Sequence, residues 1–415
     1  MTALRIGFLL GLRQIQRANF WTTALIIFVM MLTFLNLIAV SGILVGLIEG
    51  SERAVQRNSL GDLVLSELAE EDRILETTSV INTLNTFPEI TNYAVRYKGN
   101  GQIEANYKER RDLAGERDIV AGIVTGINTV REDEMTNLSS LLIEGEYLNP
   151  DEEGYILIGA YFIKRYAEQF GDVFEALDDV YVGDSVRLTS GNVTKEFIVK
   201  GIVQSKVDEI NLNTYIPERE FRRFFGRIDR NANQIVMRLD ESVTSDEMKV
   251  LLTKTGVSDY AKIQTFQESL PKFLIDIKNT FNLLGTLIGS IGLVVASITI
   301  FIIIFINALS RRKQIGILKG IGIDRNVIQI AYVLQAAFYA IAGSALGALL
   351  TYGFLVGYFD RNPINFPFSD GILVAEPIGT LYRFITLFVI TLFAGFVPAW
   401  IIVKQNTLNS ILGRK

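Results

Sequence analysis

Long apolar runs alternate with one long polar block along this chain. Four segments contain no Asp, Glu, Lys or Arg, namely residues 18–48, 279–310, 326–359 and 384–403. Because about 20 apolar residues cross the hydrocarbon core of a bilayer, each segment can span a membrane. The first is too long for a cleaved signal peptide, and no small-residue cleavage site follows it. The pattern predicts one transmembrane helix before the polar block and three after it.

The distribution of basic residues orients these helices. Lys and Arg precede the first segment, separate the second from the third and follow the fourth, at Arg5, Arg13, Arg17, Arg311, Arg312, Lys313, Lys319, Arg325, Lys404, Arg414 and Lys415. Basic residues near span ends mark the cytoplasmic side. We therefore predict a multi-pass plasma or inner membrane protein with both termini cytoplasmic and the polar block outside.

The predicted boundaries follow from these segments. They are a cytoplasmic segment 1–17, helix 1 at 18–48, an extracytoplasmic α/β domain with stalk helices at both ends at 49–272, helix 2 at 273–310, a cytoplasmic loop 311–325, helix 3 at 326–359, an external loop 360–383, helix 4 at 384–403 and a cytoplasmic tail 404–415.

The polar block is acidic. Residues 49–272 contain 40 acidic and 26 basic residues, a net charge of −14, whereas the remainder carries 5 acidic and 14 basic residues, a net of +9; the two sum to −5. A block of this length can form its own core, and we expect two subdomains. The fold class predicted is a membrane protein of four helices with a large mixed α/β extracytoplasmic domain between helices 1 and 2.

Local patterns predict elements inside this block. Residues 92–107 alternate as a β-hairpin with its turn at 98–102, and residues 186–188 and 197–203 form a second hairpin across 190–192. Strands are predicted at 118–124 and 234–239, and an amphipathic helix at 160–170 is closed by Gly171.

Two segments join the block to the membrane helices. Helix 1 has no strong breaker before Gly61, so it is expected to continue there, and Thr265 and Glu268 have the spacing of a capping box that starts a helix leading into helix 2. Pro271 predicts a kink in its second turn. Two long helices projecting as a stalk are favoured; separate helices broken at the membrane surface remain the alternative.

Composition excludes several kinds of chemistry. The chain has no Cys and no His, so it has no disulfide, thiolate nucleophile, imidazole base or zinc site of the usual kind. It has no Gly-Lys dipeptide and hence no P-loop of its own. Uncharged spans disfavour an ion or proton pathway, and the external carboxylates are best explained as a solvated surface. We expect no catalytic or metal site in this chain.

Small residues recur at helix-packing spacing within the apolar segments. They are Gly285 and Gly289, Gly343 and Gly347, and Gly353 and Gly357. Such spacing lets helix backbones approach closely. The pattern fits both packing within the chain and a homodimer seam, and it does not decide between them.

The loop sequence RRKQIGILKGIGIDRNVI, residues 311–328, resembles that of FtsX-like (MacB-type) permeases, the membrane subunits of type VII ABC transporters. The segment PAWIIVKQNTLNSILGRK from Pro398 resembles the closing segment of that family, and the arrangement of one plus three spans agrees. In size the chain is similar to stand-alone lipoprotein-releasing permeases.

The resemblance implies a set of partners and contact residues. ATP and Mg would be bound by a separate ABC ATPase subunit, present in two copies, and a second permease copy or sister permease would complete the complex. Membrane lipid and an extracytoplasmic adaptor or substrate protein are further expected partners, and no nucleic acid is expected. The implied ATPase-coupling residues are Arg312, Lys313, Gln314, Ile315, Gly316, Ile317, Leu318, Lys319, Gly322 and Asp324, with Pro398 and Lys404 at the cytoplasmic end of helix 4.

The function favoured is that of a permease that transmits ATP-driven motion from cytoplasmic ATPases to its external domain, to export or extract a lipid, lipoprotein, peptide or drug. The alternative is a non-transporting signalling complex that regulates an external enzyme such as a cell-wall hydrolase. A simple receptor is disfavoured because the cytoplasmic pieces are too short for an output domain. A coupling role for the loop predicts that Asp at Gly316 or Leu318 weakens assembly with the ATPase.

Overall fold

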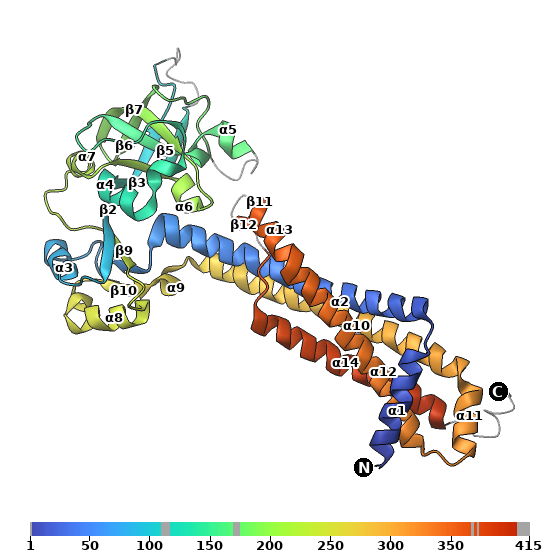
Figure 1. Ribbon diagram of the computed structural model, residues 1–415. Helices are drawn as coiled ribbons and strands as arrows, with labels where there is room; N and C mark the ends of the chain where they lie inside the picture. Colours follow the sequence, from blue (N-terminus) through green and yellow to red (C-terminus); the bar gives the residue numbers. More distant parts are fainter. Residues whose placement is uncertain (1, 109–116, 169–174, 367–368, 372, 405–415) are drawn as a thin grey trace. The chain divides into compact units, whose positions relative to one another are not determined.

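The computed structural model describes residues 2–108, 117–168, 175–366, 369–371 and 373–404 (Figure 1). The chain forms two compact units, a helical unit built from its two terminal parts and a sheet domain built from residues 51–274. Four helices are long and apolar enough to cross a membrane, one before the sheet domain and three after it. The predicted fold class, one plus three helices around a mixed α/β domain, is therefore confirmed.

The helices of the helical unit are long and nearly continuous. They are α1 (Thr2–Gln16), α2 (Phe20–Val55), α10 (Lys272–Ser310), α11 (Arg312–Gly320), α12 (Arg325–Leu350), the π-helical turn η6 (Thr351–Leu355), α13 (Val356–Arg361) and α14 (Pro377–Lys404), with the short strands β11 (Ile364–Phe366) and β12 (Ser369–Gly371) between α13 and α14. The ends of α2 and α10 nearest the sheet domain belong to that domain.

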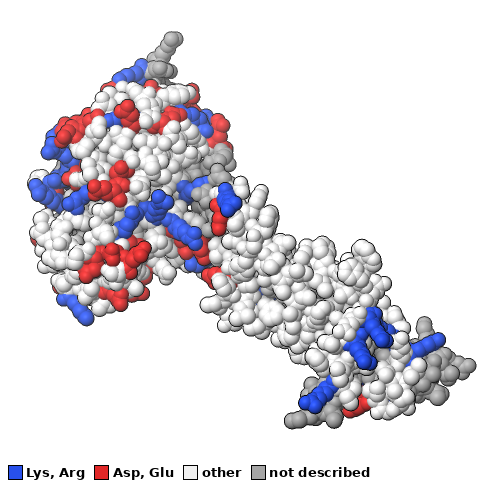
Figure 2. Space-filling model, viewed as in Figure 1, with Lys and Arg blue, Asp and Glu red and all other residues white. Residues whose placement is uncertain are grey.

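Helix α12 lies at the centre of the helical unit. It packs against α1 and α14, and glycines on its surface or on its neighbours allow these contacts to be close. Gly7 of α1 faces Ile330, and Gly395 of α14 faces Ala336. The side chains of Tyr332 and Tyr339 on α12 are buried in the middle of this packing. In Figure 2 the middle of the helical unit shows a surface without charged side chains, whereas Lys and Arg gather at its end.

The sheet domain contains the remaining elements. Its strands are β1 (Leu63–Ser66), β2 (Ile90–Glu104), β3 (Ile119–Ile127), β4 (Leu142–Gly145), β5 (Tyr155–Gly159), β6 (Ser185–Ser190), β7 (Val193–Val203), β8 (Asn213–Pro217), β9 (Gln234–Leu239) and β10 (Lys262–Thr265). Its helices are α3 (Thr77–Leu84), α4 (Thr129–Thr136), α5 (Lys164–Ala167), α6 (Asp208–Asn211), α7 (Glu218–Phe224), α8 (Ser245–Lys254) and α9 (Phe266–Ser269). Shorter turns are η1 (Gln56–Leu60), η2 (Leu138–Leu141), η3 (Ala160–Phe162) and η5 (Val257–Asp259).

One continuous sheet runs through this domain, in the order β10-β1-β9-β2-β3-β8-β5-β7-β4, with β6 paired to β2 and β7. Pairing is antiparallel except between β3 and β8 and between β5 and β7. The two expected subdomains are not separate units, because residues 51–274 form one compact body. The long strand β2 makes the connection, since its first half pairs with β9 and its second half with β3.

The predicted hairpin over residues 92–107 is wrong, because these residues lie mostly within the single strand β2. The glycines interpreted as a turn serve close packing instead. A Cβ atom on Gly99 would lie 2.5 Å from the Phe225 ring, and one on Gly101 would lie 2.9 Å from a methyl carbon of Val124. A strand glycine that makes room for a neighbour is as compatible with this pattern as a turn glycine.

The second predicted hairpin and two predicted strands are present, whereas one predicted helix is shorter than expected. The hairpin of β6 and β7 is confirmed, with Gly191 at φ +56° in its turn, and β3 and β9 form where strands were predicted. The helix predicted at 160–170 is shorter, because a 3₁₀ turn and an extended Ile163 precede α5. Gly171 lies outside the described residues.

The two segments that lead into α2 and α10 differ. Helix α2 is followed without a break by η1, which ends at Gly61. At the other segment the predicted capping box of Thr265 and Glu268 is present, but helix α9 ends after one turn. Leu270 then adopts an extended conformation, as proline imposes on the residue before it, and α10 starts after Pro271. The proline therefore breaks the helix instead of kinking it.

Candidate functional site

The segment predicted to couple to an ATPase is a helix, α11, and not an open loop. A Schellman motif ends it: Gly322 has φ +91°, the Ile323 N–H donates to the Leu318 carbonyl at 3.0 Å, and the Gly322 N–H donates to the Lys319 carbonyl at 3.1 Å. The Asp324 side chain then caps α12 by accepting from the Asn326 N–H at 3.3 Å. Gly322 and Asp324 thus fix the angle between two helices.

One face of α11 anchors it to the helical unit. Ile315 is buried with the core residues Ile328 and Val403, and Gly316 is buried beside it. Leu318 and Ile323, the two positions whose side chains meet in a Schellman motif, both pack against this core. Apolar packing therefore holds α11 against the surrounding helices.

The opposite face of α11 is exposed. It presents Lys313, Gln314, Ile317 and, just beyond the helix, Ile321. The side chains of Ile317 and Ile321 are 55% and 72% exposed. Their four-residue spacing places them on one side of the segment. We call this surface the α11 face. The side chain of Arg312 is not described.

Lys319 joins α11 to the end of α14. Its ammonium group donates a hydrogen bond to the Val403 carbonyl at 3.0 Å. The last carbonyls of a helix lack intrahelical partners and attract cations, so this contact stabilises the end of α14. Lys404 lies over the Trp400 ring, 4.7 Å from its centroid. Pro398 is buried one to two turns earlier in α14. The structure thus brings the predicted loop and the predicted helix end together through Lys319.

Two of the three glycine pairs pack against another helix of the same chain. A Cβ atom on Gly343 would lie 2.4 Å from the Cβ of Met30, and one on Gly347 would lie 2.9 Å from the Phe34 ring, both on α2. Gly285 and Gly289 also face α2, at ordinary contact distances of 3.5 and 3.8 Å from leucine side chains. In contrast, no atom of the described residues lies within 4 Å of a Cβ built on Gly353 or Gly357.

A second set of contacts, which the sequence did not reveal, holds the turn η1 within the sheet domain. The guanidinium group of Arg96 donates to the Ser59 carbonyl at 2.8 Å, and Arg238 donates to the Arg57 carbonyl at 3.2 Å. Both carbonyls belong to the π-helical turn η1. Glu132 pairs with Arg96 at 2.6 Å in a buried ion pair. We call these contacts the η1 joint.

Two opposing effects set the pKa of Arg96 in the η1 joint, namely burial and the neighbouring Glu132 carboxylate. Burial alone lowers the pKa of this guanidinium group, but the Glu132 carboxylate outweighs burial, so the pKa is raised and the charge is retained. Arg96 lies within the residues predicted as a hairpin, and nothing in that local pattern indicates that its side chain is buried.

Comparison with known proteins agrees with the interpretation of the helical unit. Residues 286–407 match the family model of the FtsX-like permease C-terminal domain. A macrolide export ATP-binding/permease protein MacB from Campylobacter jejuni is 22% identical over 229 residues, covering 52% of this chain and 34% of that protein. A MacB protein from Burkholderia pseudomallei is 27% identical over 164 residues, covering 38% and 25%. The matches thus span about a third or less of these relatives' length.

A third relative covers more of the chain, and two solved structures align with about half of it. An uncharacterized ABC transporter permease from Methanocaldococcus jannaschii is 23% identical over 288 residues, covering 65% of each protein. Among solved structures, the periplasmic region of MacB from Actinobacillus actinomycetemcomitans aligns with 51% of this chain and 92% of its own at 16% identity and a TM-score of 0.36. The extracellular domain of the ABC-type transporter YknZ from Gram-positive bacteria aligns with 49% and 98% at 12% identity and a TM-score of 0.33.

Proposed function

We propose that this chain, a MacB-like ABC permease with an FtsX-like permease domain over residues 286–407, transmits motion driven by separate ATPase subunits to its sheet domain. The α11 face is the single observation that carries this proposal. Its two exposed isoleucines sit among basic and amide side chains, and an exposed apolar patch with a polar rim is typical of a protein-binding surface.

The packing of α11 supports a mechanical role. A partner that moves the α11 face displaces Ile315, Leu318 and Lys319, which are held by core packing and by the Val403 carbonyl. Helix α11 also lies between α10 and α12 in the chain. At the far end of α2, the η1 joint holds the helix to the sheet domain through Arg96 and Arg238. Because η1 continues α2 along the chain, motion of α2 would reach β2 and β9 through these contacts.

This permease would act as a dimer, with a second copy or a sister permease, and with two ATPase subunits that bind ATP and Mg. Its substrate would be a lipid, lipoprotein, peptide or drug that is exported or extracted at the outer face of the membrane. Apolar spans without charged residues suit helices that move as levers better than an aqueous pathway.

The test is Ile317→Asp in the full chain. Gly316 and Leu318 face inward, so Asp at either position disturbs packing as well as docking, whereas Ile317 is exposed. We expect the amount of ABC ATPase that is recovered with the tagged protein from native membranes to fall at least tenfold. Val250→Asp, which replaces an exposed apolar side chain by a carboxylate in the sheet domain, is the matched control and should leave recovery unchanged.

Equal recovery with Ile317→Asp and the wild type would contradict the proposal. Recovery of the ATPase together with an external partner that binds in one nucleotide state, without movement of any substrate, would indicate a regulatory complex instead of a transporter.

A further inference from the structure

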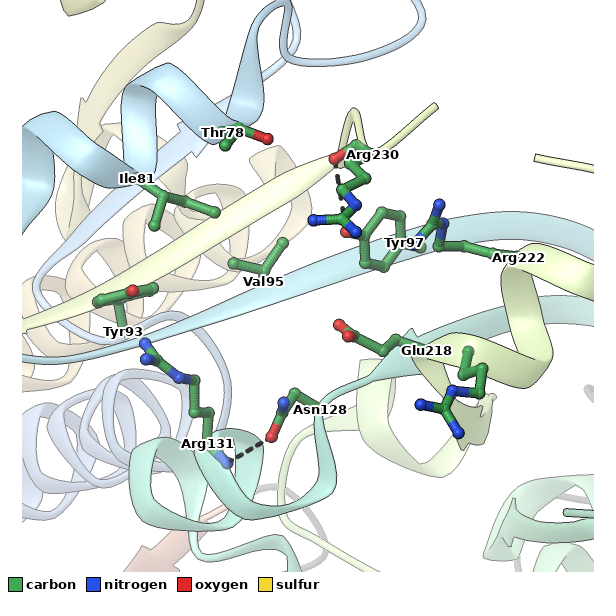
Figure 3. A pocket seen from close by; sticks show the side chains of 11 residues that line it. Thr78, Ile81, Tyr93, Val95, Tyr97, Asn128, Arg131, Glu218, Arg222 and Arg230 are labelled. Atoms are coloured by element: carbon green, nitrogen blue, oxygen red, sulfur yellow. Dashed lines mark hydrogen bonds between the residues drawn. The ribbon is translucent and has the colours of Figure 1, made fainter. Parts of the chain in front are cut away.

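An open cavity of about 430 Å³ lies in the sheet domain, beside the first half of β2 (Figure 3). Ile81 of α3, Val95 and the rings of Tyr93 and Tyr97 form its apolar part. Four arginines also line it: Arg131 of α4, Arg219 and Arg222 of α7, and Arg230 before β9. We call this cavity the arginine pocket. Its volume lies within the range of about 300–1,000 Å³ that is usual for small-molecule sites.

The charge of the arginine pocket opposes that of its surroundings. Four arginines and one acidic residue, Glu218, give the lining a formal charge of +3. The block of residues 49–272 that contains it has a net charge of −14. Since charges beyond about 8–10 Å are largely screened at physiological ionic strength, an anion in the pocket responds to the nearby arginines more than to the distant carboxylates.

None of the four arginines forms an ion pair with an acidic side chain in the part of the chain that the structure describes. Their sequence neighbours do. Arg223, next to Arg222 on α7, pairs with Glu153 at 2.8 Å. Asp229, next to Arg230, pairs with Arg73 at 2.6 Å. The domain therefore pairs basic and acidic groups around the pocket, but among the described residues the four arginines of the pocket itself form no ion pair.

The contacts of the individual pocket arginines do not neutralise their charge. The Nε atom of Arg222 is buried and has no hydrogen-bond partner among the described residues, while one of its Nη atoms donates to the Ile228 carbonyl at 3.3 Å. Arg131 is held over the Tyr93 ring, with its guanidinium carbon 4.4 Å from the centroid. Tyr97 donates to the Arg230 carbonyl at 3.4 Å. The Tyr93 ring thus holds the Arg131 guanidinium group in place without neutralising it, and the Tyr97 hydroxyl holds the backbone of Arg230.

We propose that the arginine pocket binds an organic anion that carries at least two carboxylate or phosphate groups beside an apolar or aromatic group. Guanidinium groups match the geometry of carboxylates and phosphates with paired N–H donors. Tyr93, Tyr97 and Val95 supply the contact for the apolar part. Clustered like charges destabilise a free protein, and a bound anion removes that repulsion. This inference stands whether or not the chain couples to an ATPase.

The experiment titrates the detergent-solubilised full chain with two probes and follows binding by calorimetry. One probe is inorganic pyrophosphate and the other is the peptide acetyl-Glu-Phe-Glu-amide; acetyl-Gln-Phe-Gln-amide is the uncharged counterpart. We expect at least one anionic probe to bind and the uncharged peptide not to bind. Displacement of the acidic peptide by pyrophosphate shows that charge alone is recognised, whereas a preference for the peptide shows that the aromatic part contributes.

Variants separate binding from folding. Arg222→Gln and Arg230→Gln should each weaken binding at least tenfold. Arg223→Gln, one position away on α7 but paired with Glu153, is the matched control and should bind as the wild type does. Without a probe, Arg222→Gln and Arg230→Gln should leave Tm unchanged or raise it, because they reduce repulsion between like charges. Arg230 is exposed, so its variant remains informative if Arg222→Gln fails to fold.

Two results would overturn the proposal. One is that neither anionic probe binds the wild type at millimolar concentrations. The other is that Arg230→Gln, correctly folded, binds the probes as tightly as the wild type does.

Discussion

The contact between α2 and α12 in the helical unit and the contact between β2 and α4 in the sheet domain are both close, but different side chains make them. In the helical unit Gly343 lies against Met30, and the contact contains no charge. In the sheet domain Arg96 and Glu132 form an ion pair whose side chains are 7% and 2% exposed. Large buried side chains such as Leu138, Ile210 and Tyr215 line the space beside that pair.

The surroundings of the two units account for the difference. Apolar side chains gain little by leaving lipid for a helix interface, so membrane helices associate through close van der Waals packing at small residues. In water the burial of large apolar side chains is itself favourable. A domain stabilised in that way can hold a buried ion pair, provided that each charge keeps its partner. Three changes test this comparison.

The largest effect is expected from Glu132→Gln in the sheet domain. The change leaves the Arg96 guanidinium buried without its carboxylate, and loss of one partner of a buried pair costs about 3–5 kcal/mol in the free energy of unfolding. Hydrogen exchange of β2 and α4, measured by mass spectrometry on the full chain, reports this loss. Exchange should also increase in η1, because Arg96 holds the Ser59 carbonyl.

Glu153→Gln is the control for this change. Its ion pair with Arg223 lies at the surface, with side chains 60% and 46% exposed. Exposed pairs contribute about 0–1 kcal/mol, so exchange should hardly change. A loss of equal size in both variants would mean that burial of the Arg96 pair has no special role.

The two units also differ in how much of their structure the sequence predicts. The helical unit was predicted from long uncharged segments alone, because nothing but a helix satisfies its backbone there. Inside the sheet domain, local patterns found β3, β6, β7 and β9 but failed at β2. Gly99 and Gly101 fit a turn as well as a strand until the positions of Phe225 and Val124 are known, and these lie far away in the chain.

Part of the candidate site was likewise predicted from the sequence, and part of it was not. The sequence predicted a site at α11 and the end of α14, but it did not separate outward Ile317 from inward Ile315 and Leu318. Nor did it show the bond between Lys319 and the Val403 carbonyl, which are 84 positions apart. The η1 joint and the arginine pocket depend on side chains from several distant elements. No local sequence pattern indicates that side chains so far apart in the chain lie close together in the fold.

An intermediate effect is expected from Gly343→Ala in the helical unit. The added methyl carbon would lie 2.4 Å from the Cβ of Met30 and 3.1 Å from its carbonyl carbon, so α2 and α12 must separate. Overpacking of this kind costs about 1–3 kcal/mol. Thermal denaturation of the detergent-solubilised protein should occur at a lower temperature.

Gly357→Ala provides the comparison for Gly343→Ala. Nothing lies within 4 Å of a Cβ at that position, and alanine is the better helix former, so stability should stay the same or rise slightly. If both variants lost the same stability, the cost would come from helix conformation in general and not from the contact with Met30.

The smallest effect is a difference in acid sensitivity. A hydrogen bond from Lys200 lowers the pKa of the Glu152 carboxylate. Hydrogen bonds from Tyr166 and then Arg165 lower the pKa of Glu144. Burial, in contrast, raises the pKa of Asp208. A lowered carboxylate pKa stabilises the folded domain above the unfolded value of about 4.3, and this stabilisation is lost as the pH falls through the folded value. Protection of the sheet domain from exchange, measured against the intrinsic exchange rate at each pH, should therefore decrease below about pH 4.3.

The helical unit should respond less, and the chain supplies its own probes. Both tryptophans, Trp21 and Trp400, lie in that unit, so their emission follows it separately from exchange in the sheet domain. Lys200→Met sharpens the test, because it removes the hydrogen bond to Glu152. The variant domain should be less stable than the wild type at pH 7, and the difference should shrink as Glu152 becomes protonated. A difference that stayed constant down to pH 3 would mean that Lys200 acts through packing and not through the charge of Glu152.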